Sequence, residues 1–279
     1  MAMDTIDLKF CNELVEKFKY VINHPDRTPS SVYYVGVDLG TACVVTVVLN
    51  DKRQPVAGIY EYADVVRDGM VVDYIGAVNI VRKMKMELER QLGVEELLYA
   101  AAAIPPGTDH LDGGAVKNVV EAAGYTVTAL LDESTAANNV LRIQNGAVVD
   151  IGGGTTGIYI FRDGKEVYVA DEPTGGTHFS LVLAGAYKKS YEEAERLKRN
   201  PAHYREILPV LKPVIEKVST IINRHMKGHQ VDRIVLVGGT CCLTGIEAII
   251  EQKTGVPTHK PADPMFVTPL GIAYSCVAE

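Results

Sequence analysis

The chain has 279 residues, of which 47% are hydrophobic, so it can bury sizeable cores in one large domain or in two lobes. Its formal net charge is -7, from 28 basic and 35 acidic side chains, which gives no electrostatic reason to expect a nucleic-acid or anionic-membrane partner. No apolar run approaches the roughly 20 residues of a membrane-spanning helix and no signal-peptide pattern opens the chain, so we expect a cytoplasmic protein.

Residues 1–30 are predicted to form a separate amphipathic helix and a linker. Between residues 7 and 22 the apolar side chains recur at steps of three and four, at Leu8, Cys11, Leu14, Val15, Phe18, Val21 and Ile22. Residues 23–31 contain two prolines and short polar side chains, which break helices and favour turns. The apolar stripe has two interpretations. The helix either packs on the body of the same protein, or it docks in a groove on a partner and directs the chain into a protein shell.

The body of the chain opens with a strand, a tight loop and a returning strand. Its β-branched and aromatic segments predict strands at residues 32–38, 44–49 and 56–60, separated by loops at 39–41 and 50–52. Asp38 ends the first strand, and Gly40 and Thr41 lie in the loop that follows it.

The same plan recurs in the second half of the chain. Strands are predicted at residues 147–150 and 158–161, with a loop at 151–157 and a turn at 162–165. Asp150 ends the first of these strands, as Asp38 does in the first copy, and the loop holds Gly152, Gly153, Gly154 and Thr155. This self-similarity predicts a duplicated unit and two lobes of similar build.

Helices and strands alternate elsewhere, which indicates the mixed α/β class. Helices are predicted at residues 77–92, 115–123, 179–187, 191–199, 204–225, 246–254 and 269–277. Further strands are predicted at residues 97–104, before a loop at 105–107, and at 125–131 and 233–237. We assign residues 31–145 with 264–279 to the first lobe and residues 146–263 to the second.

The two glycine loops have the composition of a phosphate site. Nucleotide phosphates need backbone N–H donors that approach closely, which favours glycine, and their metal needs hard oxygen ligands such as aspartate. One such loop alone is more often a simple hairpin connection. Two matching loops that face each other would instead place Asp38 and Asp150 near one magnesium ion, with amides around the β- and γ-phosphates.

Two further segments are candidate parts of the same site. Glu133, within residues 132–137, lies between a predicted strand and a predicted helix, so it either projects into the cleft or caps the helix. Gly238, Gly239 and Thr240 follow a strand at its carboxyl end, where ligands of α/β sheets usually bind. Glycines at that place let the backbone lie flat against an adenine ring.

Five segments resemble the motifs of the actin, sugar-kinase and DnaK-chaperone superfamily, and the likeness covers nearly all of the chain after residue 31. Residues 35–41 and 149–156 are similar to its phosphate motifs, 132–137 and 268–273 to its connecting motifs, and 235–240 to its adenosine motif. The resemblance implies a two-lobed actin-like ATPase (ribonuclease H-like) fold, with duplicated mixed sheets flanked by helices and a reduced second lobe. It also implies ATP or ADP with Mg²⁺ as cofactors. An obvious sugar-binding motif is missing, which argues against a sugar kinase.

The same resemblance implies a role for each matching residue. Asp38 and Asp150 would hold magnesium and its waters, and Glu133 would help to orient the attacking water. Nucleotide-binding positions are implied at Gly40, Thr41, Gly152, Gly153, Gly154, Thr155, Gly176, Gly238, Gly239 and Thr240. Glu195 and Lys198 share one helical face and would lie at the ribose and adenine. Without the resemblance, their helix reads as an ordinary solvated one with ion pairs.

Within the superfamily the chain resembles the ethanolamine-utilisation protein J (EutJ) group, chaperone-like proteins associated with ethanolamine breakdown in bacterial microcompartments. The compact second half and residues 68–73 carry this likeness. It implies a weak Mg-dependent ATPase that couples lobe closure to an unidentified protein partner, either an ethanolamine-catabolism enzyme or a microcompartment component. Peptide clamping in the DnaK manner is not expected, because the second lobe is reduced. The alternative is a nucleotide-dependent scaffold or actin-like filament subunit whose hydrolysis is incidental.

Overall fold

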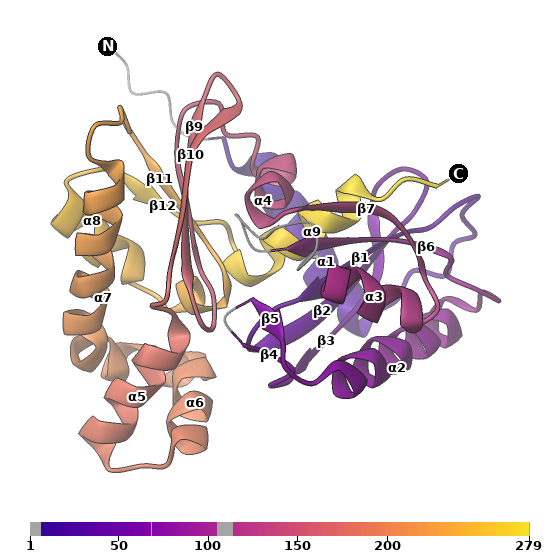
Figure 1. Cartoon of the computed structure of the whole chain (residues 1–279), viewed down its shortest axis with the longest axis horizontal. Coiled ribbons are helices and arrows are strands. Elements are labelled where there is room, and N and C mark those ends of the chain that lie inside the picture. The colour runs from indigo at the N-terminus through magenta and orange to yellow at the C-terminus, as the bar shows by residue number, and fades with distance from the viewer. Residues whose placement is uncertain (1–6, 68, 105–113, 279) are drawn as a thin grey trace.

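The computed structural model describes residues 7–67, 69–104 and 114–278, so the predicted loop at 105–107 and Asp68 of the segment 68–73 lie outside the described residues. Two five-stranded sheets stand side by side, with helices outside and between them (Figure 1). Within the described ranges no helix is long and apolar enough to cross a bilayer.

The first sheet has the strand order β3-β2-β1-β6-β7. Its strands are β1 (Tyr34–Leu39), β2 (Cys43–Leu49), β3 (Pro55–Tyr62), β6 (Tyr99–Ile104) and β7 (Thr126–Asp132). β1 to β3 form an antiparallel meander, and β6 and β7 run parallel to β1. One face is covered by α2 (Tyr74–Leu92) and α3 (Gly114–Ala122), and a short hairpin of β4 (Val66–Arg67) and β5 (Met70–Val71) precedes α2.

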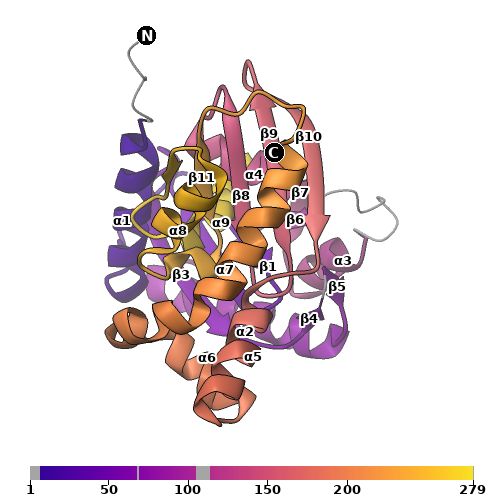
Figure 2. The ribbon, with the colours of Figure 1, turned by 90° about the vertical axis from the view of Figure 1, so that its left-hand side faces the viewer.

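The second sheet repeats this topology in the order β10-β9-β8-β11-β12. Its strands are β8 (Gly146–Ile151), β9 (Thr156–Arg162), β10 (Lys165–Glu172), β11 (Ile234–Val237) and β12 (Thr258–His259). The helices of this half are α5 (Gly176–Tyr187), α6 (Tyr191–Arg199), α7 (Tyr204–Met226) and α8 (Ile246–Thr254), with short 3₁₀ turns η1 (Pro201–His203), η2 (Gly239–Cys242) and η3 (Pro264–Phe266). Helix α7 lies across the sheet (Figure 2). The duplicated α/β plan is confirmed, whereas the lobe boundaries stay a prediction.

The sequence pattern misses two strands of the second sheet, the two-residue strand β12 and the longer strand β10. The longer strand pairs only with β9 in the sheet order, so it is an edge strand of the described sheet. Val167 and Val169 are 47% and 40% exposed, and charged residues stand at both ends of the strand. The clear apolar run that identifies β9 is therefore absent from β10.

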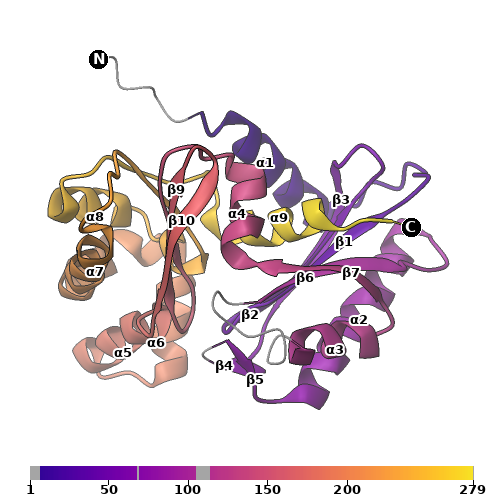
Figure 3. The ribbon, with the colours of Figure 1, turned by 45° about the horizontal axis from the view of Figure 1, so that its top comes forward.

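Helices α4 (Glu133–Leu141) and α9 (Val267–Ser275) cross between the two sheets, next to α1 (Figure 3). A Cβ atom on Gly271 of α9 would overlap the main-chain carbonyl of Ala136 in α4, so only glycine permits this approach. Gly36 of β1 also lies against α9, because a Cβ atom there would collide with the backbone of Ala273. Both close contacts lie within the predicted first lobe, and residues of α4 and α9 also share a buried cluster with strands of the second sheet.

Helix α1 (Lys9–Asn23) packs on the body of the same chain. Its residues Cys11, Leu14, Val15, Phe18 and Val21 are buried in a cluster that includes residues of both sheets. Phe18 occupies the space left by Gly58 of β3 and meets Phe266 edge-on, with ring centroids 5.1 Å apart. Asn12 accepts a hydrogen bond from the Ala262 N–H at 2.9 Å. The apolar stripe therefore has the first of its two predicted arrangements and is part of the core.

Candidate functional site

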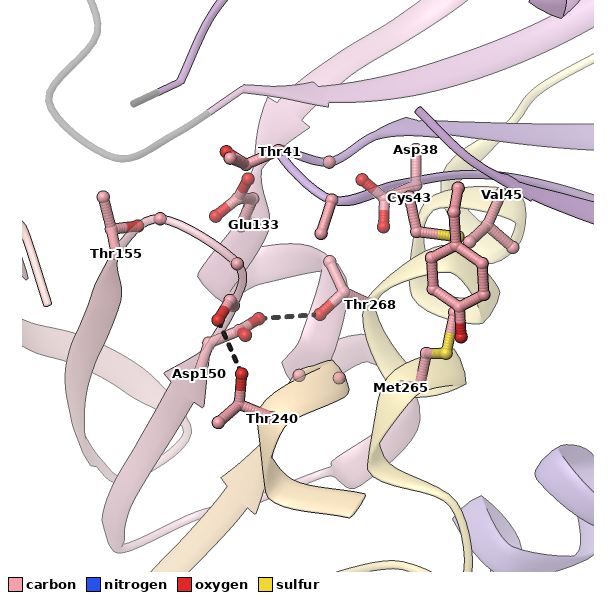
Figure 4. Close-up of a pocket in the computed structure, with 18 of the residues that line it drawn as sticks. Asp38, Thr41, Cys43, Val45, Glu133, Asp150, Thr155, Thr240, Met265 and Thr268 are labelled. Atoms are coloured by element: carbon pink, nitrogen blue, oxygen red, sulfur yellow. Dashed lines mark hydrogen bonds between the residues drawn. The ribbon is translucent and has the colours of Figure 1, made fainter. Parts of the chain in front are cut away.

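A cavity of about 160 Å³ lies where β1 and β8 end (Figure 4). The predicted site residues that line it are Asp38, Gly40, Thr41, Glu133, Asp150, Gly152, Gly153, Gly154, Thr155, Glu195, Lys198, Gly238, Gly239 and Thr240. Gly176 lies behind this lining, where its carbonyl oxygen accepts a hydrogen bond from Lys198 Nζ at 2.8 Å. The fold thus brings residues from both halves of the chain to one place.

The two glycine loops touch each other at this cavity. The first loop connects β1 with β2, and the second connects β8 with β9. A Cβ atom on Gly153 would lie 2.8 Å from the Cβ of Ala42, so the missing side chain is what lets the loops meet. Inside the second loop, the Gly152 N–H donates to the Thr155 carbonyl at 3.1 Å. An anion bound here would face backbone from both halves at once.

Three carboxylates point into the cavity (Figure 4). Asp38 comes from β1, Asp150 comes from β8, and Glu133 is the first residue of α4. Asp150 accepts a hydrogen bond from Thr268 Oγ1 at 3.1 Å. Gly238 has a φ of +90°, and a Cβ atom on it would collide with the Asp150 carboxylate. Glycine is therefore needed at 238 for both its backbone conformation and the room it leaves for the acid.

Burial and mutual repulsion make these acids hard to ionise. Burial raises the pKa of Asp38 to about 7, with a further contribution from the charge of Asp150. Burial also raises the pKa of Asp150 to about 6, although the hydrogen bond from Thr268 opposes the shift. The pKa of Glu133 is raised well above its usual value, by burial first and by Asp150 and Asp38 next. A cation between the three acids would relieve this repulsion.

The basic side chains that line the cavity, among the residues the structure describes, are already paired. Lys198 Nζ and Arg199 Nε each donate to the Glu195 carboxylate at 2.8 Å, and Ser180 donates to the same group. Glu195 is only 9% exposed. This face of α6 is thus a buried hydrogen-bonded cluster and not the solvated surface that its charges alone suggest, and it leaves the three acids without a partner cation.

The donor set fits a magnesium ion that arrives with phosphate. In the described part of the chain, no group of three or more His, Cys, Asp and Glu side chains is arranged to hold a metal ion by itself. Magnesium is commonly bound through one or two carboxylates together with waters and the phosphates of its ligand. Asp38 and Asp150, half-buried and facing one cavity, supply the two carboxylates that such a site needs.

Several lining residues are not among the predicted ones: Ala42, Cys43, Val45, Tyr62, Gly157, Arg199, Met265 and Thr268. The Arg199 guanidinium carbon lies 3.6 Å from the centroid of the Tyr62 ring, so this pair joins α6 of the second half to β3 of the first. Thr268 opens the connecting motif 268–273, which is a sequence signal for it. Tyr62 and Arg199 carry no such signal, because their contact depends on how the two halves face each other.

Two larger hollows of about 550 and 650 Å³ adjoin the cavity and share Tyr62, Lys198 and Arg199 with it. The first hollow also reaches Thr240, and the second reaches Gly153. The cavity by itself is smaller than the roughly 300–1,000 Å³ of typical small-molecule pockets. A ligand the size of a nucleotide therefore extends from the cavity into a neighbouring hollow.

Known proteins share this architecture and much of this sequence. The family model described as Type IV pilus assembly protein PilM matches residues 108–267. Ethanolamine utilization protein EutJ of Salmonella typhimurium is 45% identical over 262 residues, which cover 94% of this chain and 92% of that protein. The chain belongs to the EutJ family. A crystal structure of EutJ from Carboxydothermus hydrogenoformans matches with a TM-score of 0.91 and 45% identity, covering 96% of this chain and 98% of that one.

The EutJ fold is actin-like. MreB 5 of Spiroplasma citri, solved bound to AMPPNP, matches with a TM-score of 0.71 at 17% identity, covering 87% of this chain and 95% of that one. At that identity the likeness shows the fold alone. Together these matches confirm the predicted actin-like fold class, and the family model relates the chain to PilM.

Proposed function

We propose that this EutJ-family protein binds Mg-ATP in the cavity, hydrolyses it slowly, and uses lobe closure to act on a protein partner in ethanolamine utilisation. One observation carries the proposal: two touching glycine loops and three carboxylates, drawn from both halves of the chain, surround a single cavity. MreB 5 has the same fold and was solved bound to AMPPNP, which supports a nucleotide as the ligand.

The phosphates would bind to the two loops. Backbone N–H groups of Gly40, Gly153 and Gly154 would donate to the phosphate oxygens, and the hydroxyls of Thr41 and Thr155 would add further contacts, while the Gly152 N–H keeps its bond to the Thr155 carbonyl. Asp38 and Asp150 would hold Mg²⁺, which supplies positive charge to the β- and γ-phosphates when it is bound. The same charge offsets the repulsion between the two aspartates.

Glu133 would orient the attacking water and accept a proton from it. The water oxygen forms a bond to the γ-phosphorus while the bond from that phosphorus to the bridging oxygen breaks, so that ADP and inorganic phosphate are the products. Burial raises the pKa of Glu133 first and the charges of Asp150 and Asp38 raise it next, so positive charge nearby would favour its ionised form by offsetting the two aspartates. Its place at the start of α4 also lets the helix N-terminus favour the ionised form.

Ribose and adenine would lie on the side of α6 and η2. Glu195 and Lys198 would contact the ribose and the base, and the backbone of Gly238, Gly239 and Thr240 would lie against the adenine ring. Gly176 would act indirectly in this arrangement, because its carbonyl holds Lys198 in place.

Coupling to a partner would use the relative position of the two halves. Residues of α4 and α9 pack in one cluster with strands of both sheets, and the contact between Tyr62 and Arg199 spans the two halves at the cavity. A nucleotide that enters between them favours one arrangement over another. The EutJ relatives are named for ethanolamine utilization and the matching family model for pilus assembly. These names support a partner protein, either an ethanolamine-catabolism enzyme or a microcompartment component.

Phosphate release from the purified protein tests the proposal. Asp150→Asn keeps the size of the side chain but removes its charge, so we expect the rate to fall by about 100-fold or more. Asp163→Asn is the matched control, because Asp163 lies exposed on the turn between β9 and β10. If Asp150→Asn releases phosphate as fast as the unaltered protein, the roles assigned to the carboxylates are wrong.

A further inference from the structure

Tyr159 of β9 carries a buried hydroxyl that nothing described so far uses. The side chain is only 1% exposed, and its Oη atom has no hydrogen-bond partner among residues 7–67, 69–104 and 114–278. Buried polar atoms are nearly always hydrogen-bonded, because leaving one unpaired costs free energy. The unpaired hydroxyl therefore needs an explanation, either a functional role or a bound ligand or water that forms the missing hydrogen bond.

The hydroxyl lies directly behind the cavity wall. Asp150, Gly157 and Asp171 pair with one another across β8, β9 and β10, so they stand in one row on one face of the sheet. Tyr159 follows Gly157 by two residues and therefore faces the same way. A Cβ atom on Gly157 would collide with the Tyr159 hydroxyl, so the hydroxyl occupies the space that this glycine leaves. Gly157 itself lines the cavity.

Packing holds the ring in this position. Tyr159 belongs to the buried cluster between the sheets that also contains Ala137 and Val140 of α4. Glu133 is the first residue of the same helix and projects into the cavity. Burial raises the pKa of the Tyr159 phenol, and among the charges that raise it further Glu133 comes first, ahead of Asp150 and Asp171. The phenol therefore remains a hydrogen-bond donor at neutral pH. Among the neighbouring charges, the Glu133 carboxylate raises its pKa most.

We propose that Tyr159 is a positioning residue for hydrolysis, whose hydroxyl reaches through the gap at Gly157 and donates a hydrogen bond to a water molecule shared with Glu133. This inference rests on the proposed function. The phenol would restrict the orientation of Glu133 and of the water that attacks the γ-phosphorus, while making no contact with the nucleotide. Its contribution is thus confined to the chemical step, and it does not add to the affinity for ATP.

Tyr159→Phe tests the inference, with Tyr125→Phe as a matched control. Tyr125 is likewise buried, at 4% exposure, and its Oη atom also has no partner among the described residues, but it lies in the core of the first sheet. Both substitutions remove one unpaired hydroxyl and keep the ring. For Tyr159→Phe we expect kcat for phosphate release to fall about tenfold, with KM for ATP and the Kd for AMPPNP unchanged. Tyr125→Phe should leave all three quantities unchanged.

The outcomes separate this inference from the proposed function. If the unaltered protein hydrolyses ATP and Tyr159→Phe behaves like Tyr125→Phe, the positioning role is wrong and the proposed function stands. If Tyr159→Phe weakens AMPPNP binding as much as it lowers kcat, the hydroxyl serves the shape of the site, and the inference is again wrong. If the unaltered protein releases no phosphate, the proposed function fails and takes this inference with it. Melting temperatures of both variants show whether each is folded.

Discussion

Asp38, Glu133 and Asp150 cost the nucleotide-free protein stability. The three residues are half-buried at one cavity, Asp150 raises the pKa of Asp38, and both aspartates raise the pKa of Glu133. Their arrangement makes little sense for folding alone, because isolated buried charges are unfavourable. It is explained by a ligand that brings positive charge. These three side chains are thus the clearest sign of the function.

The stability of the nucleotide-free protein should fall as the pH rises from about 4 to about 7. The pKa of Asp38 is raised from an ordinary value of 3.8 to about 7. In this window the folded protein keeps a proton that the unfolded chain has lost, so raising the pH favours the unfolded chain. Asp38→Asn should remove part of this dependence and increase the melting temperature more at about pH 8 than at about pH 5.

Thermal unfolding without nucleotide or magnesium measures this effect. Asp163→Asn is again the control and should leave the pH dependence as it is, since Asp163 is exposed. An Asp38→Asn protein with the same pH dependence as the unaltered chain would show that Asp38 titrates normally and that its buried position has been misjudged.

At the scale of helices and strands, α4 and α9 pack against each other and share a buried cluster with strands of both sheets. Gly271 of α9 is the point of closest contact, since any side chain there would overlap the Ala136 carbonyl. Glu133 begins α4 and Thr268 lies in α9, so both helices also carry residues of the cavity. Changes in this crossing therefore act on the site as well as on the core.

Gly271→Ala should destabilise the protein by about 3 kcal/mol or more, because the added methyl group meets backbone that cannot rotate away. Gly185→Ala is the matched control. Gly185 lies within α5 and a Cβ atom there would meet nothing within 4 Å, so this substitution should stabilise the protein by roughly 0.5–1 kcal/mol. Urea unfolding of the two variants compares them. Equal stabilities would mean that the crossing is looser than its geometry indicates.

Elements with a strong local pattern could be predicted from the sequence. The strands on either side of each glycine loop are apolar runs bounded by turn residues, and α1 has a regular apolar stripe, so both were recognisable before any tertiary contact was known. β10 was not, because an edge strand with exposed valines lacks such a run. The site divides in the same way. Asp38 and Asp150 follow from the repeated strand-loop-strand plan. Contacts between the halves could not be predicted, because no local sequence pattern indicates them.

Two contacts show why some residues of the site could not be predicted from the sequence: Tyr62 with Arg199, and Tyr159 with Gly157. The Tyr62 ring comes from β3 of the first half, and the Arg199 guanidinium comes from α6 of the second half. Tyr159 reads as an ordinary aromatic residue of a buried strand, and only the pairing of three strands reveals that its hydroxyl lies in the space of a missing side chain. Both features depend on how the elements pack in three dimensions, which a short stretch of sequence does not determine.

At the scale of the whole molecule, the site exists only where the duplicated halves meet. Each half supplies one glycine loop and one aspartate, while the joining helices supply Glu133 and Thr268. A ligand held by both loops would favour one relative position of the halves, and a partner protein could bind that arrangement in preference to another. Because both halves build the site, nucleotide binding depends on residues of both.

Calorimetric titration with Mg-AMPPNP measures this dependence, using the unaltered chain, Asp38→Asn and Asp150→Asn. We predict one nucleotide per chain, and a loss of affinity of roughly tenfold or more for each substitution, because the two aspartates come from different halves and serve one ion. No binding to the unaltered chain, or a loss of affinity in only one of the two variants, would contradict a single site built from both halves.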